Sequence, residues 1–545
     1  QMRYLSENKR EDMRMKKRTA ARSMAALMGA AMVLTACGGG NTTAPTTGAS
    51  SGGETQTASE SAESGKITKT DIVVGQASDI VTLDPAGQQD TTSGVLMKHA
   101  YSTLLDVDNE GKVVPDLAES YEMKSDTEYV FKLREDACFW DGTPVTAQDV
   151  KFSLDRAKGM PKTKSNTSKI EEVTVNGDHE VTIKLTEPYA AFKTIVTQHN
   201  LSILSEKAVT EAGDSYGDVD NLLGSGPFKV TEWVPNDHYT LVRNDNYWGE
   251  MPIATSITCR VIPEGSARTI ALEAGEIDVV WSVDPTDCAN VESNPDVKLL
   301  SQPSTGIDYV GMNTQKEKFS DKRVRQAINY ALDKQTFVDT IIEGRGLVAN
   351  SYINAAIPGW TDEVEAYPYD PEKAKELLAE AGYPDGFECS IFVNGDLRTR
   401  SAQILQAQLA DVGIKVDIST YEWGALLDTL NAGEHEMFLL GWSNTSFDPD
   451  GSTYQLFYSG NHGATGNRAF FSNDKVDELI LSAQRESEES KRMELYKELQ
   501  FVLHDESPWC PLYYKENNVG VRADLKGFTL HAGAQHYLGN CHYEE

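Results

Sequence analysis

The sequence predicts an α/β protein that contains more than one structural unit. From Ile67 onward, short β-rich runs alternate with helical patterns, as in α/β folds. A helical pattern over 401–412 is followed at once by a strand pattern over 414–418. The chain has 545 residues, and at about 150 residues per domain this length allows roughly three units.

The first half of the chain is dominated by strand patterns. β-rich runs predict strands at 72–75, 128–134, 181–185 and 239–243. Between the second and third of these, Thr146 is expected to cap a helix whose apolar face includes Val150 and Leu154.

Helical periodicity is clearer in the second half. We expect helices around 324–332, 374–381 and 401–412, and one long helix over 474–505. Gly382, directly after the second of these, is typical of the residue beyond a helix C-terminus. A strand pattern at 511–514 follows the long helix and must pair with a sheet formed elsewhere.

The N-terminal segment is predicted to be an export signal. A basic stretch that includes Arg14 and Arg22 precedes a short apolar run, which is too short for a comfortable membrane span. The last four residues of that run, Leu34-Thr35-Ala36-Cys37, resemble a bacterial lipobox. We therefore expect a signal peptide over 1–36, with a true start near residue 13 or 15, a lipidated Cys37 and a flexible linker over 37–66. An ordinary signal peptide with Cys37 close to the cut is the alternative.

Charge and composition exclude two broad classes of protein. There are 83 acidic and 50 basic residues and a formal net charge of −33, so the field of the chain repels nucleic acid. A hydrophobic content of 39% excludes a polytopic membrane protein. The six cysteines beyond Cys37 show no metal-ligand spacing, and buried thiols and disulfides are equally open for them.

No catalytic constellation is present in the sequence. The segment 224–227 (Gly-Ser-Gly-Pro) lacks the strand-to-helix context of a nucleophile elbow and is interpreted as a tight turn. His435-Glu436 is not followed by a second His one helical turn later, and no phosphate-binding loop occurs. We expect no enzyme activity, no cofactor and no metal site.

The most unusual local composition follows a predicted strand. An apolar run ends at Trp442 and continues as a polar loop of amides, hydroxyls and carboxylates up to Asp450. Such a loop at a strand end presents an aromatic wall and hydrogen-bonding groups to a ligand in a cleft. The alternative is that 448–451 is only a turn and that Trp442 belongs to the core.

Several segments, taken in order, resemble the large solute-binding proteins of ABC importers that carry peptides, nickel and some oligosaccharides. They include Trp140-Asp141-Gly142-Thr143-Pro144 and Gly441-Trp442. The matching segments are 114–120, 131–134, 140–150, 224–230, 243–249, 271–278, 323–328, 369–374, 421–424 and 441–442.

The resemblance implies a periplasmic-binding-protein-like fold, with two α/β lobes around a cleft and an extra domain inserted into the first lobe. By this analogy, lobe I comprises 67–111, 191–304 and 512–545, the inserted domain 112–190, and lobe II 305–511. The chain would cross between the lobes at 305–313 and 507–513, which would form the hinge.

The resemblance also implies a ligand-binding role for the Trp442 loop. In relatives that bind peptides with free N-termini, the third residue after the matching Trp is often an Asp that pairs with the ligand ammonium. Here that residue is Thr445, which carries no charge, so Asp448 or Asp450 would have to substitute. Asn444 and Thr445, with the hydroxyl of the next residue, would suit a neutral, hydroxyl-rich or capped ligand.

Four further residues are expected near the ligand. Arg398 and Arg400, predicted to lie in a loop before the 401–412 helix, would hold a carboxylate; solvated surface charge is the alternative. Tyr309, near the hinge, and Trp423 are expected as aromatic residues of the cleft.

We therefore expect a lipid-anchored receptor on the extracytoplasmic face of a bacterial cell membrane. It would capture an oligopeptide-like or other small polar solute and deliver it unaltered to the permease subunits of an ABC importer. We expect a monomer without a nucleic acid partner. A sensory receptor of the same fold and, third, an exported hydrolase are the alternatives.

Overall fold

A computed structural model describes residues 66–545. The predicted signal peptide, Cys37 and the linker up to residue 65 lie outside the described residues. In the described part, no helix has both the length and the apolar composition that are needed to span a bilayer.

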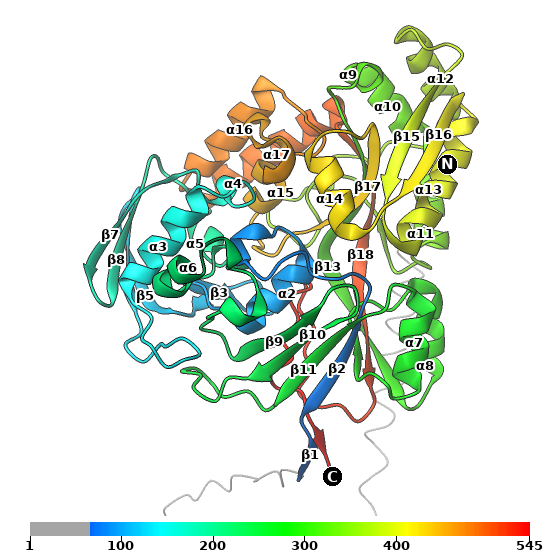
Figure 1. Ribbon diagram of the computed structural model, residues 1–545. Helices are drawn as coiled ribbons and strands as arrows, with labels where there is room; N and C mark the ends of the chain where they lie inside the picture. The colour runs from blue at the N-terminus through cyan, green and yellow to red at the C-terminus, as the bar shows by residue number, and fades with distance from the viewer. Residues whose placement is uncertain (1–65) are drawn as a thin grey trace, which may run out of the picture. The chain divides into compact units, whose positions relative to one another are not determined.

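An 11-stranded sheet extends through two lobes (Figure 1). The first lobe contains β2 (Asp71–Gln76), β9 (Phe228–Val234), β10 (His238–Arg243), β11 (Ser256–Val261) and β12 (Val279–Val280). The second lobe contains β15 (Phe387–Val393), β16 (Ile414–Thr420) and β17 (Met437–Ser443). In the first lobe β2 pairs in parallel with β11 and β12, and in the second lobe β15 pairs in parallel with β16 and β17. Parallel pairs joined through helices confirm the predicted α/β class.

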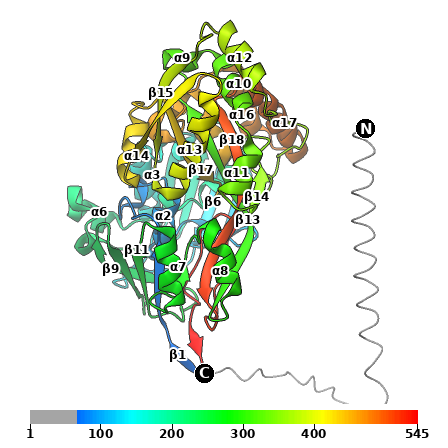
Figure 2. The same ribbon diagram turned by 90° about the vertical axis from the view of Figure 1, so that its right-hand side faces the viewer.

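Two long strands connect the lobes. β13 (Val297–Met312) and β18 (Trp509–Arg522) lie side by side and antiparallel (Figure 2). β18 pairs with β12 in the first lobe, and β13 pairs with β17 in the second; the short β14 (Gly346–Val348) pairs with β18. β18 is longer than the strand predicted at 511–514, because the polar residues after the apolar run continue the pairing with β13.

Each lobe packs helices against its part of the sheet (Figure 1). The first lobe has α2 (Thr91–Ala100), α6 (Glu206–Ala212), α7 (Gly265–Glu273) and α8 (Cys288–Ser293). The second lobe has α10 (Lys322–Ala331), α11 (Lys334–Thr340), α12 (Pro371–Glu380), α13 (Gly395–Ala410), α14 (Trp423–Asn431), α15 (Asp450–Phe457), α16 (Asp474–Arg485) and α17 (Glu489–Glu506). The residues of α10 that recur at helical spacing, Val324, Ala327 and Ile328, are fully buried in the core of the second lobe.

A separate four-stranded sheet lies at the left of Figure 1, in the order β5 (Ala118–Ser125), β6 (Glu128–Leu133), β8 (Glu180–Leu185) and β7 (Ile170–Gly177). Helix α3 (Ala147–Lys158) packs on it and begins, as predicted, at Thr146. Thr146 and Asp149 form a capping box, in which the carboxylate accepts the Thr146 N–H at 2.9 Å. This sheet lies inside the range predicted for the inserted domain.

The single long helix predicted over 474–505 is wrong, because the structure has two helices, α16 and α17. The break falls at 486–488, in a run of glutamate and serine without apolar residues. Such a run favours solvent over the core, so the chain turns there and α17 packs back against α16.

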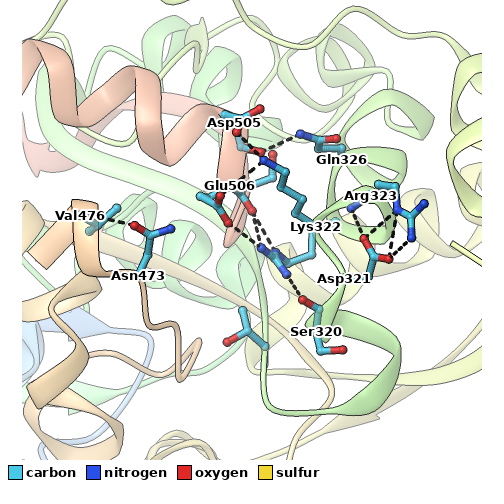
Figure 3. Close-up of polar contacts among 12 residues, drawn as sticks. Ser320, Asp321, Lys322, Arg323, Gln326, Asn473, Val476, Asp505 and Glu506 are labelled. Atoms are coloured by element: carbon cyan, nitrogen blue, oxygen red, sulfur yellow. Dashed lines mark hydrogen bonds and ion pairs between the residues drawn. The ribbon is translucent and has the colours of Figure 1, made fainter.

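Polar contacts from α10 secure the end of α17, as Figure 3 shows. Lys322 Nζ lies 2.6 Å from Asp505 Oδ2, and Gln326 Nε2 donates to the Asp505 carbonyl at 2.7 Å. Arg325 donates to the Glu506 carbonyl at 2.6 Å. Gln326 and Arg325 thus satisfy carbonyls that the last turn of a helix leaves without partners, and they position the start of β18.

All six described cysteines are free thiols. Cys138 is half-buried, and the other five are buried. The sequence left buried thiols and disulfides equally open for these cysteines, and the structure has thiols.

Candidate functional site

A cavity of about 390 Å³ lies between the two lobes. The first lobe contributes Gln76 at the end of β2, Asp90 before α2, and Trp281 after β12. The second lobe contributes residues from β17 and from the starts of α13 and α14. The volume falls in the range of small-molecule sites, which also favour the junction between domains.

Polar contacts join the lobes around this cavity. Arg400 pairs with Asp284 at 2.8 Å, and Arg345 pairs with Glu292 at 2.7 Å. The Tyr189 hydroxyl, which follows the four-stranded sheet, donates to Asp450 at 2.6 Å. The lobes are therefore closed over the cavity.

Four of the residues predicted to bind the ligand line the cavity: Trp442, Thr445, Trp423 and Arg398. Strand β17 brings Trp442 to the cavity, where its indole N–H donates to the Gly451 carbonyl at 3.1 Å. Trp423 is the first residue of α14, and its indole nitrogen is buried without a partner among the described residues.

The other residues predicted to lie near the ligand do not line the cavity: Asn444, Ser446, Asp448, Asp450, Arg400 and Tyr309. Asn444 donates to the Asp448 carbonyl at 2.7 Å and thereby shapes the loop from within. Both oxygens of Asp448 accept from Arg492, at 2.9 and 2.5 Å. Tyr309 lies behind the cavity wall, stacked on Trp509 with ring centroids 3.4 Å apart. Their predicted contact with a ligand has no support in this geometry.

Thr445 connects the lobes. Its hydroxyl donates to Gln198 Oε1 at 2.9 Å, and both residues line the cavity. Asp450, the other predicted substitute for a missing ammonium partner, is occupied by Tyr189 and by Gln484, whose amide donates to it at 2.9 Å. The loop therefore offers no free carboxylate to a ligand ammonium.

Arg398 and Arg400 lie in the first turns of α13, and the loop predicted for them is wrong. The prediction started the helix at the first apolar residues, but the helix begins before them, after Asn394. Arg400 is paired with Asp284, whereas Arg398 makes no ion pair within the described residues. The Arg398 guanidinium lies 5.9 Å from the Trp423 ring centroid, in cation–π range.

The carboxylate next to Arg398 already has a cation. Asp308 is buried and pairs with Lys515 at 2.8 Å. Burial tends to raise the pKa of Asp308, but Lys515 and Arg398 together hold it below its ordinary value. A Cβ on Gly441 would collide with Asp308 and would lie 3.3 Å from Arg398 Nη2, so only glycine fits between strand and guanidinium. Arg398 thus retains hydrogen-bonding capacity for an anion in the cavity.

Several buried polar atoms on the cavity wall have no hydrogen-bond partner among the described residues. A buried polar atom left in this state costs on the order of 1–3 kcal/mol. Their concentration on one cavity indicates a wall that a polar ligand completes. They are Gln76 Nε2, Gln89 Oε1, Asp90 Oδ2, His199 Nδ1, Trp281 Nε1, Arg398 Nε, Trp423 Nε1 and Gln535 Oε1.

Sequence reasoning missed the wall residues that come from distant parts of the chain. Arg468 lies in the loop between a short turn at 463–465 and α16, and Gln535 lies in the C-terminal segment beyond β18. Asp90 has a local signal, since Asp directly before a helical pattern predicts a helix cap, but that signal does not indicate a ligand site. Within residues 66–545, no group of three metal-binding side chains is arranged to hold an ion.

Comparison with known proteins gives a consistent result. The sequence profile of the bacterial extracellular solute-binding proteins, family 5 middle, matches residues 112–464. The glutathione-binding protein GsiB of Escherichia coli O157:H7 is 32% identical over 479 residues, which cover 84% of this chain and 92% of GsiB. A dipeptide-binding protein of Escherichia coli K12 is 30% identical over 470 residues, covering 79% of this chain and 86% of that protein.

A solved structure shows the same fold. The periplasmic binding protein DppA from Helicobacter pylori, in complex with the peptide STSA, superposes with a TM-score of 0.84 at 28% identity. The match covers 88% of this chain and 99% of DppA. The predicted two-lobe, periplasmic-binding-protein-like architecture is confirmed.

Proposed function

This chain belongs to the family 5 bacterial extracellular solute-binding proteins, and on that premise we propose that it captures a short peptide or peptide-like solute between its lobes for an ABC importer. It then delivers the solute unaltered to the permease subunits in the membrane. Cys37, whose thiol is acylated before the signal peptide is cleaved in front of it, anchors the protein to that membrane.

One observation carries the choice of ligand class: the cavity combines indole walls with a guanidinium and buried polar atoms that have no partners among residues 66–545. A peptide supplies the complementary groups, because its terminal carboxylate pairs with Arg398 and its amides bond the indole N–H and side-chain amide groups. GsiB and the dipeptide-binding protein are both named for ligands larger than a single amino acid. Their names favour a solute of two or three residues for this chain.

The proposed domain organisation follows the prediction: lobe I over 67–111, 191–304 and 512–545, the inserted domain over 112–190, and lobe II over 305–511. The continuous strands β13 and β18 support a hinge at 305–313 and 507–513, since they are the path of the chain between the lobes. A ligand that touches both lobes stabilises the closed form by its extra affinity for that form.

Replacing Arg398 with Gln is expected to weaken binding of short peptides about 10- to 100-fold, because a hydrogen bond to a charged group contributes about 1.5–3 kcal/mol. Calorimetry with di- and tripeptides on the intact protein measures this. The matched control is Lys415→Gln, which removes one cation from an exposed pair on the surface and should leave affinity unchanged.

Two results would contradict the proposed function. The ligand class is wrong if short peptides give no thermal shift while another solute class does. At 100 times its Kd, that other solute should stabilise the protein by roughly 2.7 kcal/mol. If mass spectrometry recovers the bound peptide in hydrolysed form, the result supports the alternative that the protein is an exported hydrolase.

Replacing Cys37 with Ser is expected to release the protein from the membrane fraction of cells that express the full chain, because no acyl chain is then added. Fractionation followed by immunoblotting measures the distribution. Tight membrane association of this variant would refute the lipid anchor and leave the ligand proposal untouched.

A further inference from the structure

A second contact between the lobes lies outside the cavity, where the four-stranded sheet meets α15 and α16. The Tyr189 hydroxyl, a few residues beyond the end of β8, donates to Asp450 Oδ2 at 2.6 Å. Ala190 donates its backbone N–H to the Gln484 carbonyl at 2.7 Å. An ion pair between Glu187 and Arg485 borders these two bonds. We call this contact the clasp, and its residues are Glu187, Tyr189 and Ala190 on one side and Asp450, Gln484 and Arg485 on the other.

The four-stranded sheet and its helix α3 are fixed to the first lobe. Arg156 of α3 forms a two-pronged pair with Asp84, which follows β2, at 3.0 and 2.6 Å. Trp140, which lies between β6 and α3 in the chain, donates its backbone N–H to the Gly224 carbonyl at 2.9 Å and packs into the core of the first lobe. Lys229 of β9 donates to the Trp140 carbonyl at 3.0 Å. The sheet therefore moves with the first lobe, and the clasp joins two bodies that separate when the cavity opens.

Tyr189 and Asp450 are buried in the closed form, with exposed fractions of 2% and 1%. The Tyr189 ring belongs to the core of the four-stranded sheet, and its hydroxyl reaches across to Asp450. The other carboxylate oxygen of Asp450 accepts from the Gln484 side chain at 2.9 Å. Burial, together with the negative charge of Asp448, raises the pKa of Asp450 to about 6, and the Tyr189 hydroxyl acts in the opposite direction because it stabilises the ionised carboxylate.

Separation of the lobes changes what the Asp450 carboxylate can bond. In the open form, water replaces the Tyr189 hydroxyl as the donor to Oδ2. In the closed form water has no access, so a carboxylate oxygen without this hydroxyl would stay buried and without a partner. The hydroxyl therefore stabilises the closed form much more than the open form, and only such a difference shifts an equilibrium between two forms.

We propose that the clasp determines how long the lobes stay closed over a bound solute, with Tyr189 acting through Asp450 as a positioning residue that does not touch the solute. None of the six clasp residues lines the cavity. This inference rests on the proposed function, because it needs a solute captured between the lobes, but it applies to any class of solute. The four-stranded sheet then controls release of the solute from outside the cavity.

The test is Tyr189→Phe, which keeps the ring in the core and removes only the hydroxyl. Trp281, Trp423 and Trp442 line the cavity, so stopped-flow tryptophan fluorescence on the intact protein follows binding and release of trialanine as the probe. Dissociation is expected to become about tenfold faster, with an equal loss of affinity in calorimetry and an association rate constant that stays within about twofold. A variant that only folds poorly would instead bind with a lower stoichiometry and keep its dissociation rate constant.

Three further variants serve as controls. Tyr121, on β5 of the same sheet, is 38% exposed, so water replaces any partner that its hydroxyl loses, and Tyr121→Phe should leave dissociation unchanged. Arg485→Gln breaks an ion pair whose guanidinium is 49% exposed, and it should speed dissociation only about twofold. In an Asp450→Asn background the acceptor has lost its charge, so Tyr189→Phe should have a clearly smaller effect than in the unaltered protein.

Hydrogen exchange of the Ala190 N–H measures opening of the clasp without any solute. Mass spectrometry of short proteolytic peptides from the ligand-free protein resolves this amide. Tyr189→Phe is expected to speed its exchange about tenfold, and Tyr121→Phe is expected to leave it unchanged.

The outcomes separate the two proposals. If trialanine and other short peptides fail to bind the unaltered protein, the proposed ligand class is wrong, and the exchange of Ala190 decides on the clasp. If Tyr189→Phe leaves either the dissociation of bound trialanine or the exchange of Ala190 unchanged, the clasp is wrong and the proposed function stands. Faster dissociation together with faster exchange in Tyr189→Phe, and neither change in Tyr121→Phe, supports the clasp.

Discussion

Between pH 7.5 and pH 5 the protein is expected to lose about 4 kcal/mol or more of its free energy of unfolding. The cause is a set of buried histidines that are neutral in the fold. Burial lowers the pKa of His99, His435 and His531 to about 4 and that of His536 to about 3.

Hydrogen bonding explains why three of these imidazoles stay neutral. The Leu538 N–H donates to His99 Nε2 at 3.0 Å, and the His531 N–H donates to His536 Nδ1 at 3.0 Å. His531 Nδ1 in turn accepts the Gly533 N–H at 3.1 Å. Protonation of a nitrogen that accepts from a backbone N–H would break that bond and place a charge in the core.

The sign of the effect follows from these shifts. A histidine with a lowered pKa stabilises the fold above pH 6.5, and this contribution is lost as the pH falls toward its folded pKa. At pH 5 the loss is about 2 kcal/mol per group, or about 8 kcal/mol for the four. Buried Asp450, with its pKa raised to about 6, and half-buried Asp116, with its pKa raised to about 7, favour the fold as the pH falls, and together they offset at most about 4 kcal/mol.

Urea unfolding at pH 7.5, 6 and 5, followed by circular dichroism, measures this loss. The matched variant is Asp450→Asn, which removes one offsetting carboxyl but keeps an oxygen for Gln484, and it should show a larger loss on acidification. Equal stability at pH 5 and pH 7.5, or NMR evidence that His99 is protonated in the folded protein at pH 5, would contradict the prediction.

Replacing Arg492 with Met is expected to lower the free energy of unfolding by about 3–5 kcal/mol, because it leaves a buried carboxylate without its cation. Asp448 and Arg492 form a two-pronged pair, and their side chains are 11% and 9% exposed. Arg492 also acts to lower the pKa of Asp450, a second buried carboxylate nearby. Once the cation is gone, the negative charges of Asp450 and Asp448 would repel each other. Urea unfolding at pH 7.5 measures the change.

Two variants control for this effect. The double substitution Asp448→Asn with Arg492→Met removes both charges and should recover much of the loss. Lys415→Met removes one partner of an exposed pair, 77% and 79% exposed, and should change stability by less than about 1 kcal/mol. A cost for Arg492→Met as small as that of Lys415→Met would show that the buried pair is dispensable.

The Trp442 loop shows how far local patterns reached. An apolar run followed by a polar loop correctly placed Trp442 and Thr445 at the end of a strand that borders a cavity. The same pattern suggested Asp448 as a ligand residue, but Asp448 pairs with Arg492, which is 44 positions away in the sequence. A carboxylate in a polar loop looks the same in the sequence whether its cation is a ligand or a distant helix.

The α/β class, most strand and helix positions and the family resemblance could be predicted from the residues alone, because apolar periodicity and turn chemistry are properties of neighbouring positions. The break between α16 and α17 and the start of α13 at Gly395 depend on how the helices meet the rest of the second lobe. That Asp90 and Arg468 line the same cavity depends on how the two lobes meet, and these residues share no local pattern in the sequence. Periodicity records which face of a segment is buried, whereas the partner of a buried charge is decided only by packing in three dimensions.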